Sequence, residues 1–330
     1  MTSTKKHCLA FAGFSLLTFM SPSYGGDFLG DLINQTLSNA TQGKSNGLDQ
    51  ALRAVTSGDA SAPTSRSTGN SSPDNRPSTS GTGTPFYGEY IADYWKQPGA
   101  STRGDTPSTD ALGRMLVSKV NFSGKTNHPG AQGLRQKLER ILAKVLPHPA
   151  INPARGASLT VSGLLGHGDM SPIGRILPGS VSINAYSIFL DSPNTRQYPD
   201  GTYITTGNEA DSLRIEINDP GVLTDRMHAG TYNGIDLFRR GSGYMLLINN
   251  TSRPSTIPGR GNSAPVGNPD ILDPNRPLDD IQIMTIYVGT SSNIWSDAAR
   301  KKLKPTSTPG RLIGVMFSTD WASILDEVNR

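Results

Sequence analysis

A histidine and an aspartate in the run Gly166-His167-Gly168-Asp169 are the residues whose types and spacing best suit acid–base chemistry. Flanking glycines would leave the imidazole accessible, and a carboxylate beside an imidazole can orient it as a general base. His167 and Asp169 are therefore the candidate catalytic residues. The alternative is an ordinary loop histidine, because one His–Asp pair in a glycine-rich turn is a weak pattern.

Residues 249–280 form a long stretch rich in Pro, Gly, Asn and Asp between two predicted strands. Loops of this length inside a compact domain are usually either functional or disordered. Its first half contains Arg253, followed by a proline, and Arg260, which lies between two glycines. Guanidinium groups in such surroundings suit bidentate recognition of a carboxylate or phosphate, so both arginines are candidate ligand-binding residues.

The second half of this loop is acidic and offers oxygen ligands of the kind that calcium prefers. The predicted metal ligands are Asp270, Asp273, Asn275, Asp279 and Asp280. Their order differs from that of an EF-hand, and a bound Ca²⁺ ion is the only cofactor that the sequence suggests. The alternative is a set of Asx turns with an ion pair between Arg276 and an aspartate of the loop.

Other catalytic signatures are missing from the sequence. There is no G-x-S-x-G nucleophile motif, and no pair of histidines at H-E-x-x-H or H-x-H spacing. Glycoside hydrolysis would need two carboxylates that face one cleft. The carboxylates on or beside predicted strands that could supply such a pair are Asp191, Asp200, Glu216 and Asp236.

The N-terminus, residues 1–25, is typical of a cleavable signal peptide. Lys5 and Lys6 precede an apolar stretch over 8–20, and small residues at 23 and 25 place the cleavage site before Gly26. The stretch is shorter than the about 20 residues that a transmembrane helix needs, so the mature chain is expected to carry no transmembrane anchor. Export to the periplasm or the extracellular space follows.

Cleavage changes what the mature chain contains. It removes Cys8, the only cysteine, so disulfides and thiol chemistry are excluded. It also removes Lys5 and Lys6, which lowers the formal net charge from +4 to +2. A nearly balanced chain does not point to nucleic acid as a partner.

Composition divides the mature chain into three parts. Residues 26–55 contain two short amphipathic patterns, and residues 56–85 contain no Val, Ile, Leu, Met or aromatic residue. A segment of that composition cannot bury enough apolar surface to fold, so 56–85 is predicted to be a disordered linker. Residues 86–330 are predicted to form one β-rich globular domain.

Hydrophobic periodicity predicts the elements of this domain. An apolar stripe of period 3.6 predicts a helix over 131–146, and a second stripe predicts a C-terminal helix that begins after Thr319. Alternating or continuous apolar runs predict strands at 158–163, 180–190, 203–206, 212–218, 235–239, 244–248, 281–288 and 312–317. Without a repeated β–α alternation, the expected fold is mainly β with flanking helices (α+β), an antiparallel β-sandwich or open barrel.

These features favour a non-enzymatic protein of the cell envelope or extracellular space that binds an envelope polymer or another exported protein. The alternative is a hydrolase that acts on an envelope carbohydrate or peptide, through His167 and Asp169 or through a pair of strand carboxylates. An accessible His167 in a pocket would favour the enzyme.

Overall fold

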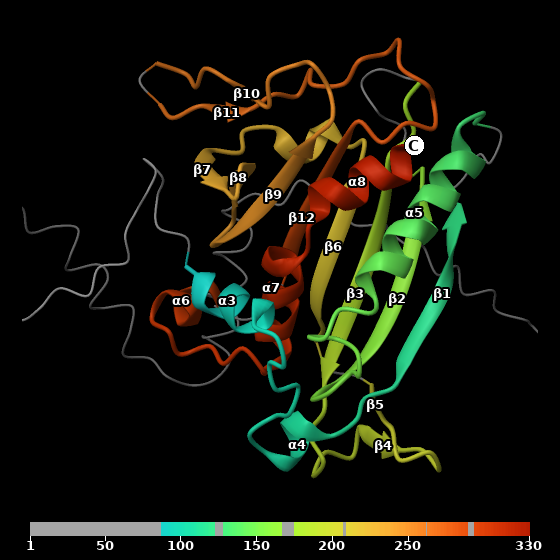
Figure 1. The fold of residues 1–330 in the computed structure, drawn as a ribbon, viewed down its shortest axis with the longest axis vertical. Coiled ribbons are helices and arrows are strands. Elements are labelled where there is room, and N and C mark those ends of the chain that lie inside the picture. The colour runs from blue at the N-terminus through green and yellow to red at the C-terminus, as the bar shows by residue number, and fades with distance from the viewer. Residues whose placement is uncertain (1–86, 123–127, 167–174, 207–208, 262, 290–293) are drawn as a thin grey trace, which may run out of the picture. The chain divides into compact units, whose positions relative to one another are not determined.

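The computed structural model describes residues 87–122, 128–166, 175–206, 209–261, 263–289 and 294–330. The predicted signal peptide 1–25, segment 26–55 and linker 56–85 lie outside these ranges. The described residues form an eight-stranded mixed sheet with helices on one face (Figure 1), which confirms the predicted mainly β, α+β class. Within these ranges, no helix has both the length and the apolar composition to cross a bilayer.

The large sheet has the strand order β1-β2-β3-β6-β12-β9-β8-β7. Its strands are β1 (Met115–Phe122), β2 (Ala157–Leu165), β3 (Gly179–Ser187), β6 (Asp211–Ile217), β7 (His228–Tyr232), β8 (Ile235–Arg240), β9 (Gly243–Asn249) and β12 (Ile283–Gly289). Two small antiparallel pairs join β4 (Thr195–Gln197) to β5 (Tyr203–Thr205) and β10 (Thr256–Ile257) to β11 (Val266–Gly267).

The sheet differs in one respect from the expected antiparallel arrangement. Strands β1 and β2 are parallel, whereas the other neighbouring strands are antiparallel. A parallel pair needs a crossover connection. Helix α5 (Ala131–Val145), which matches the helix predicted at 131–146, lies between these two strands in the chain.

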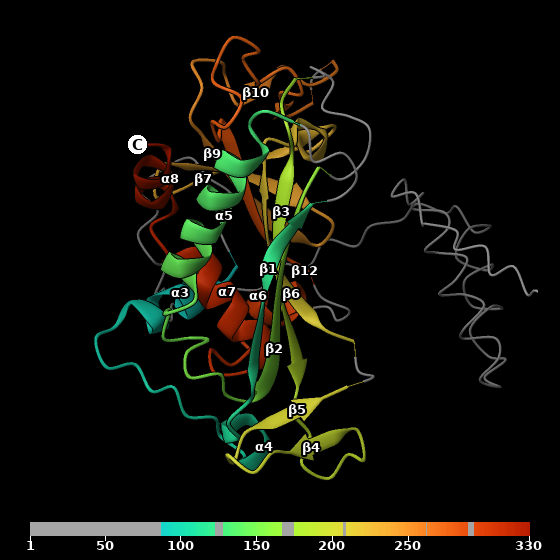
Figure 2. The ribbon, with the colours of Figure 1, turned by 90° about the vertical axis from the view of Figure 1, so that its right-hand side faces the viewer.

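Helices α3, α5, α7 and α8 lie on one face of the sheet, as the turned view in Figure 2 shows. Helix α5 packs on β1, β2 and β3, α7 (Thr308–Ser318) packs on β3, β6 and β12, and α8 (Trp321–Asn329) contacts α5 and β9. Helix α3 (Glu89–Lys96) lies against α7. The remaining short helices are α4 (Pro107–Asp110), η1 (Pro220–Leu223) and α6 (Ile294–Ala299).

The strand predicted at 312–317 is wrong, because these residues lie inside helix α7. An apolar run of this length does not distinguish a central strand from a buried helix. Here the helix is buried on all sides, with α3 on one flank and the sheet on the other. Its start signals are Ser307, whose hydroxyl accepts the Gly310 N–H, and Pro309 in the first turn.

The predicted C-terminal helix is confirmed, and its cap is Asp320. The Asp320 carboxylate accepts the Ser323 N–H at the start of α8. Thr319, the expected cap, belongs instead to the turn between α7 and α8. Either side chain type can cap a helix, so the choice depends on the direction from which the chain enters.

Apolar side chains on both faces of β9 and β12 build two cores. Alternate residues such as Leu246 and Ile286 contact the helices, whereas Leu247 and Ile283 point to the opposite face. The second core is covered by η1 and by the long loop 249–280. Its members are Ile176, Leu223, Phe238, Met245, Leu247, Ile271, Leu272, Ile283 and Tyr287. The acidic half of the loop, which contains Ile271 and Leu272, therefore covers this face of the sheet.

Candidate anion-binding site

The alternation along β6 places charged side chains on the face opposite the helices. Leu213, Ile215 and Ile217 are fully buried in the helix-side core. Arg214 and Glu216, at the intervening positions, therefore project to the other face. Strand β12 lies beside β6, and its register places Tyr287 opposite Arg214.

Glu216 on β6 is contacted by side chains from two other strands, Tyr287 on β12 and Arg240 on β8. The Tyr287 hydroxyl donates to Glu216 Oε1 at 3.0 Å, and Arg240 Nη1 lies 3.5 Å from Glu216 Oε2. The Arg240 guanidinium also stacks on the Tyr287 ring, 3.4 Å from its centroid. The Glu216 side chain is only 9% exposed. Burying a carboxylate this far is costly unless it is paired and hydrogen-bonded, and these contacts supply the partners.

A second arginine, Arg226, lies beside this group at the end of the turn that follows η1. Its Nε contacts the Val222 carbonyl at 3.4 Å. Burial lowers the pKa of Arg226 below its ordinary value, and repulsion by Arg240 lowers it further, while Tyr287, Glu216 and Asp225 act in the opposite sense. Two like charges held together in a partly buried place are unfavourable unless an anion is near.

Tyr287 is held in its neutral form. Burial is the main cause that raises its pKa to about 12, and the negative charge of Glu216 adds to the effect, while Arg240 and Arg214 oppose it. A neutral phenol donates a hydrogen bond to Glu216 and brings no negative charge of its own to the guanidinium groups. The negative charges that act on the arginines here are therefore those of Glu216 and, at Arg226, of Asp225.

We call Arg214, Glu216, Arg226, Arg240 and Tyr287 the arginine cluster. It holds three guanidinium groups and one carboxylate, and the exposed carboxylate of Asp225 is close enough to Arg226 to act on its pKa. Ser182 lies opposite Arg214 and Ser180 opposite Glu216 on β3, and both serines are half-buried. Guanidinium and hydroxyl groups together suit a ligand oxyanion such as a carboxylate, phosphate or sulfate.

The predicted catalytic residues His167 and Asp169 lie outside the described residues. Both predicted ligand-binding arginines are described and exposed. Arg253 Nη1 donates to the Asp270 carbonyl at 2.5 Å, so this side chain ties the two halves of the loop together. Arg260 lies at the turn between β10 and β11, where its carbonyl accepts the Ser263 N–H. The two arginines do not share a polar partner in this part of the structure.

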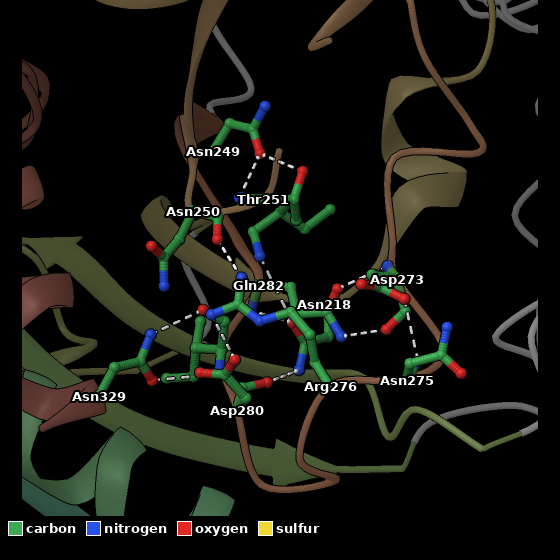
Figure 3. Close-up of polar contacts among 12 residues, drawn as sticks. Asn218, Asn249, Asn250, Thr251, Asp273, Asn275, Arg276, Asp280, Gln282 and Asn329 are labelled. Carbon is green, nitrogen blue, oxygen red and sulfur yellow. Dashed lines mark hydrogen bonds and ion pairs between the residues drawn. The ribbon is translucent and has the colours of Figure 1, made fainter. Parts of the chain in front are cut away.

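The acidic half of the loop is built into a polar junction at the end of the sheet (Figure 3). The Asp273 backbone exchanges two hydrogen bonds with the Gln282 side chain, at 2.7 and 2.9 Å. The Asp273 carboxylate accepts the Asn275 N–H in an Asx turn. Asn218, which has a positive φ of 53°, donates to the Asp280 carbonyl and accepts the Gln282 N–H.

The remaining predicted metal ligands face different partners. Asp280 pairs with Arg276 at 2.6 Å, and Arg276 also donates to the Asn250 carbonyl. Asp279 packs against Gly133 of α5, and Asp270 is exposed. These contacts match the alternative of Asx turns and an Arg276–Asp ion pair. Among the described residues, no group of three or more His, Cys, Asp or Glu side chains is arranged to hold a metal ion.

Two of the four strand carboxylates share a face of the large sheet. Glu216 and Asp236 lie in one transverse row, through Thr285 and Leu247. Strands are about 4.8 Å apart, so three steps separate the two backbones by about 14 Å. Catalytic carboxyl pairs are about 5 to 9.5 Å apart. Asp200, in the turn between β4 and β5, pairs with Arg114, and this geometry does not favour a glycosidase pair.

The fold also creates two histidine pairs that the sequence does not reveal. His228 Nε2 lies 3.0 Å from Asp236 Oδ1, across the β7–β8 hairpin. His148 Nε2 lies 2.8 Å from the Ser318 hydroxyl. That hydroxyl donates to the Gly314 carbonyl, and His148 Nδ1 accepts the Ala150 N–H. His148 is therefore the Nε2–H tautomer and donates to the serine, the opposite of the role of a general base.

Sequence reasoning missed the arginine cluster because its members come from separate segments. The one local signal is the charged alternation of Arg214 and Glu216 within an apolar strand.

The chain was also compared with protein-family models, with curated proteins and with solved structures, and none of the three comparisons found a match.

Proposed function

We propose that this protein is an exported, non-enzymatic binding protein that holds an oxyanion of an envelope or extracellular polymer at the arginine cluster. The observation that supports this is the charge balance at Glu216. Arg240 pairs with Glu216 at 3.5 Å, and the partly buried Arg226 is close enough for Arg240 to lower its pKa and for Glu216 and Asp225 to raise it. An oxyanion would relieve the repulsion between the two arginines and use donors that are already oriented.

Binding fits the geometry of this cluster better than catalysis does. Its tyrosine is neutral at ordinary pH because its pKa is about 12, and its carboxylate is paired with a guanidinium. A phenol with so high a pKa is not set to exchange a proton near neutrality. The hydrolase alternative keeps its sequence-based support at His167 and Asp169.

The polymer proposal is tested by titrating the full chain with polyglutamate, polyphosphate and neutral dextran of matched length. We expect one of the two polyanions to bind and dextran not to bind; the preferred polymer tells a carboxylate ligand from a phosphate. Replacing Arg226 or Arg240 by methionine should weaken binding roughly tenfold, because a charged hydrogen bond contributes about 1.5 kcal/mol.

The matched control is Arg260→Met, which removes an exposed arginine of the loop. Its affinity for the polyanion should equal that of the unmodified chain. If Arg260→Met weakens binding and the Arg226→Met and Arg240→Met variants do not, the ligand is held by the loop and the proposed site is wrong. If neither polyanion binds, the proposed polymer ligand is wrong.

Export is tested separately. The full-length gene product is expressed with its own N-terminus, and the protein outside the cytoplasm is analysed by intact-mass spectrometry. We expect a chain that begins at Gly26, since small residues at 23 and 25 suit signal peptidase. Uncleaved protein confined to the cytoplasm would contradict the proposal.

A further inference from the structure

A cavity of about 360 Å³ lies on the helix side of the sheet, away from the arginine cluster. Its walls are the end of α3, the β7–β8 hairpin and the junction between α7 and α8. The residues that matter below are Lys96, Tyr232, Ile235, Phe317, Thr319 and Asp320. At about 30 Å³ per water molecule, the space equals roughly twelve waters, which is the size of a dipeptide.

Lys96 provides a positioned positive charge at this cavity. Its Nζ donates to the Tyr232 hydroxyl at 2.8 Å, and that hydroxyl donates to the Phe317 carbonyl at 3.1 Å. The ammonium group also lies 5.2 Å from the centroid of the same tyrosine ring. A lysine has three N–H donors, so two remain for a ligand carboxylate.

Asp320 provides a negative charge at the same cavity. One carboxylate oxygen, Oδ1, accepts the Ser323 N–H at 3.1 Å as the cap of α8. No salt bridge joins Asp320 to Lys96 among the residues that the structure describes, although both line the cavity. Opposite charges that border one space without pairing are complementary to a ligand that carries both charges.

Thr319, which precedes Asp320 in the chain, lines the cavity without exposing its hydroxyl oxygen to it. Its Oγ1 is buried and makes no hydrogen bond within the described part of the chain. An oxygen with no accessible surface cannot bond to a ligand in the cavity, so this hydroxyl takes no part in the proposal. The apolar side chains of Ile235 and Phe317 line the same space. The cavity thus offers a cation, an anion and an apolar wall.

We propose that this cavity binds a short peptide with free termini, with its carboxylate on Lys96 and its ammonium group on Asp320. The apolar wall accommodates an aliphatic side chain. This site is independent of the arginine cluster and of the polymer proposed to bind there.

The probe is the dipeptide alanyl-leucine, titrated into the full chain by calorimetry. Two blocked forms, N-acetyl-alanyl-leucine and alanyl-leucine amide, each lack one terminal charge. We expect the unblocked dipeptide to bind and each blocked form to bind about tenfold more weakly, since each loses one charge-assisted interaction. Equal binding of all three forms overturns the proposal. So does the absence of binding at about 10 mM dipeptide, a concentration that would reveal even a weak affinity.

Two variants assign the charges. Asp320→Asn keeps a good helix cap but removes the negative charge. It should no longer distinguish the dipeptide from its N-acetyl form, yet still reject the amide. Lys96→Met should show the reverse pattern. If each variant weakens all three peptides by the same factor, the pairing of termini with Lys96 and Asp320 is wrong.

The matched controls are Lys119→Met on β1 and Asp326→Asn on α8, which are exposed and do not line the cavity. Both should keep the peptide preferences of the unmodified chain. Thermal unfolding of each variant reports whether it is folded at the temperature of the titration. The Arg226→Met and Arg240→Met variants should bind the dipeptide normally, so failure of one proposal is distinguishable from failure of the other.

Discussion

Acidification should destabilise this protein through His148, at the end of helix α5. Burial lowers the pKa of His148 from 6.5 to about 4, and its Nδ1 accepts the Ala150 N–H. The folded state therefore holds the imidazole neutral, whereas the unfolded chain takes up a proton near its ordinary pKa. The contribution to stability is complete above about pH 6.5 and is lost as the pH falls to about 4.

The size of the effect follows from the shift. Each pKa unit corresponds to about 1.4 kcal/mol, so a shift from 6.5 to about 4 corresponds to about 3 kcal/mol. His148 is not completely buried, so this is an upper value. Protonation also forces Nδ1 to lose the hydrogen bond from Ala150, which acts in the same direction.

The assay is urea unfolding of the full chain from about pH 8 to about pH 4, a range that spans the titration of a histidine. The reference is His148→Asn, whose side-chain carbonyl can accept the same Ala150 N–H but does not titrate. Carboxylates titrate alike in both proteins, so the difference between their unfolding free energies isolates His148. That difference should change by about 3 kcal/mol between pH 7 and pH 4. A constant difference would refute the reasoning.

Three further substitutions test how the fold is held together. Gly314→Ala places a Cβ 2.1 Å from Trp95 Cδ1, so α3 must move away from α7 and stability should fall by about 2 kcal/mol; an unchanged melting temperature would contradict this close packing. Arg311 is 3% exposed and donates to three backbone carbonyls, so Arg311→Met should cost about 3 kcal/mol or more in urea unfolding. Asn329 exchanges two hydrogen bonds with the Ile281 backbone, so Asn329→Ala should cost about 2 kcal/mol and speed hydrogen exchange at the Ile281 N–H; equal exchange rates would show that α8 is docked by its apolar face alone.

Local patterns in the sequence were enough to identify most elements of the fold. The helix at 131–146 and seven of the eight predicted strands correspond to observed elements. In the large sheet, strands β1 and β7 were not predicted, and neither were the short strands β4, β10 and β11. Residues of β1 are largely exposed because it is an edge strand, so its sequence lacks a buried face that would produce alternation. Strand β7 lies at the other edge of the sheet and is short.

The functional residues could be predicted less well, for a physical reason. A run such as 270–280 shows its composition, but the direction of each carboxylate depends on the turn it makes. Asp273 and Asp280 therefore looked like joint metal ligands in the sequence, whereas the folded loop directs them to an Asx turn and to Arg276. The metal prediction itself is tested by calcium titration of the melting temperature, which should rise reversibly if the ion binds.

The sequence by itself determined the periods of its helices and strands, and thus which side chains of each element face a core. For β6 it determined that Arg214 and Glu216 point away from the buried positions. Only the tertiary structure decided that Arg226, Arg240 and Tyr287 gather around Glu216. Strand order and register join residues far apart in the chain, and no local spacing encodes those non-local pairings.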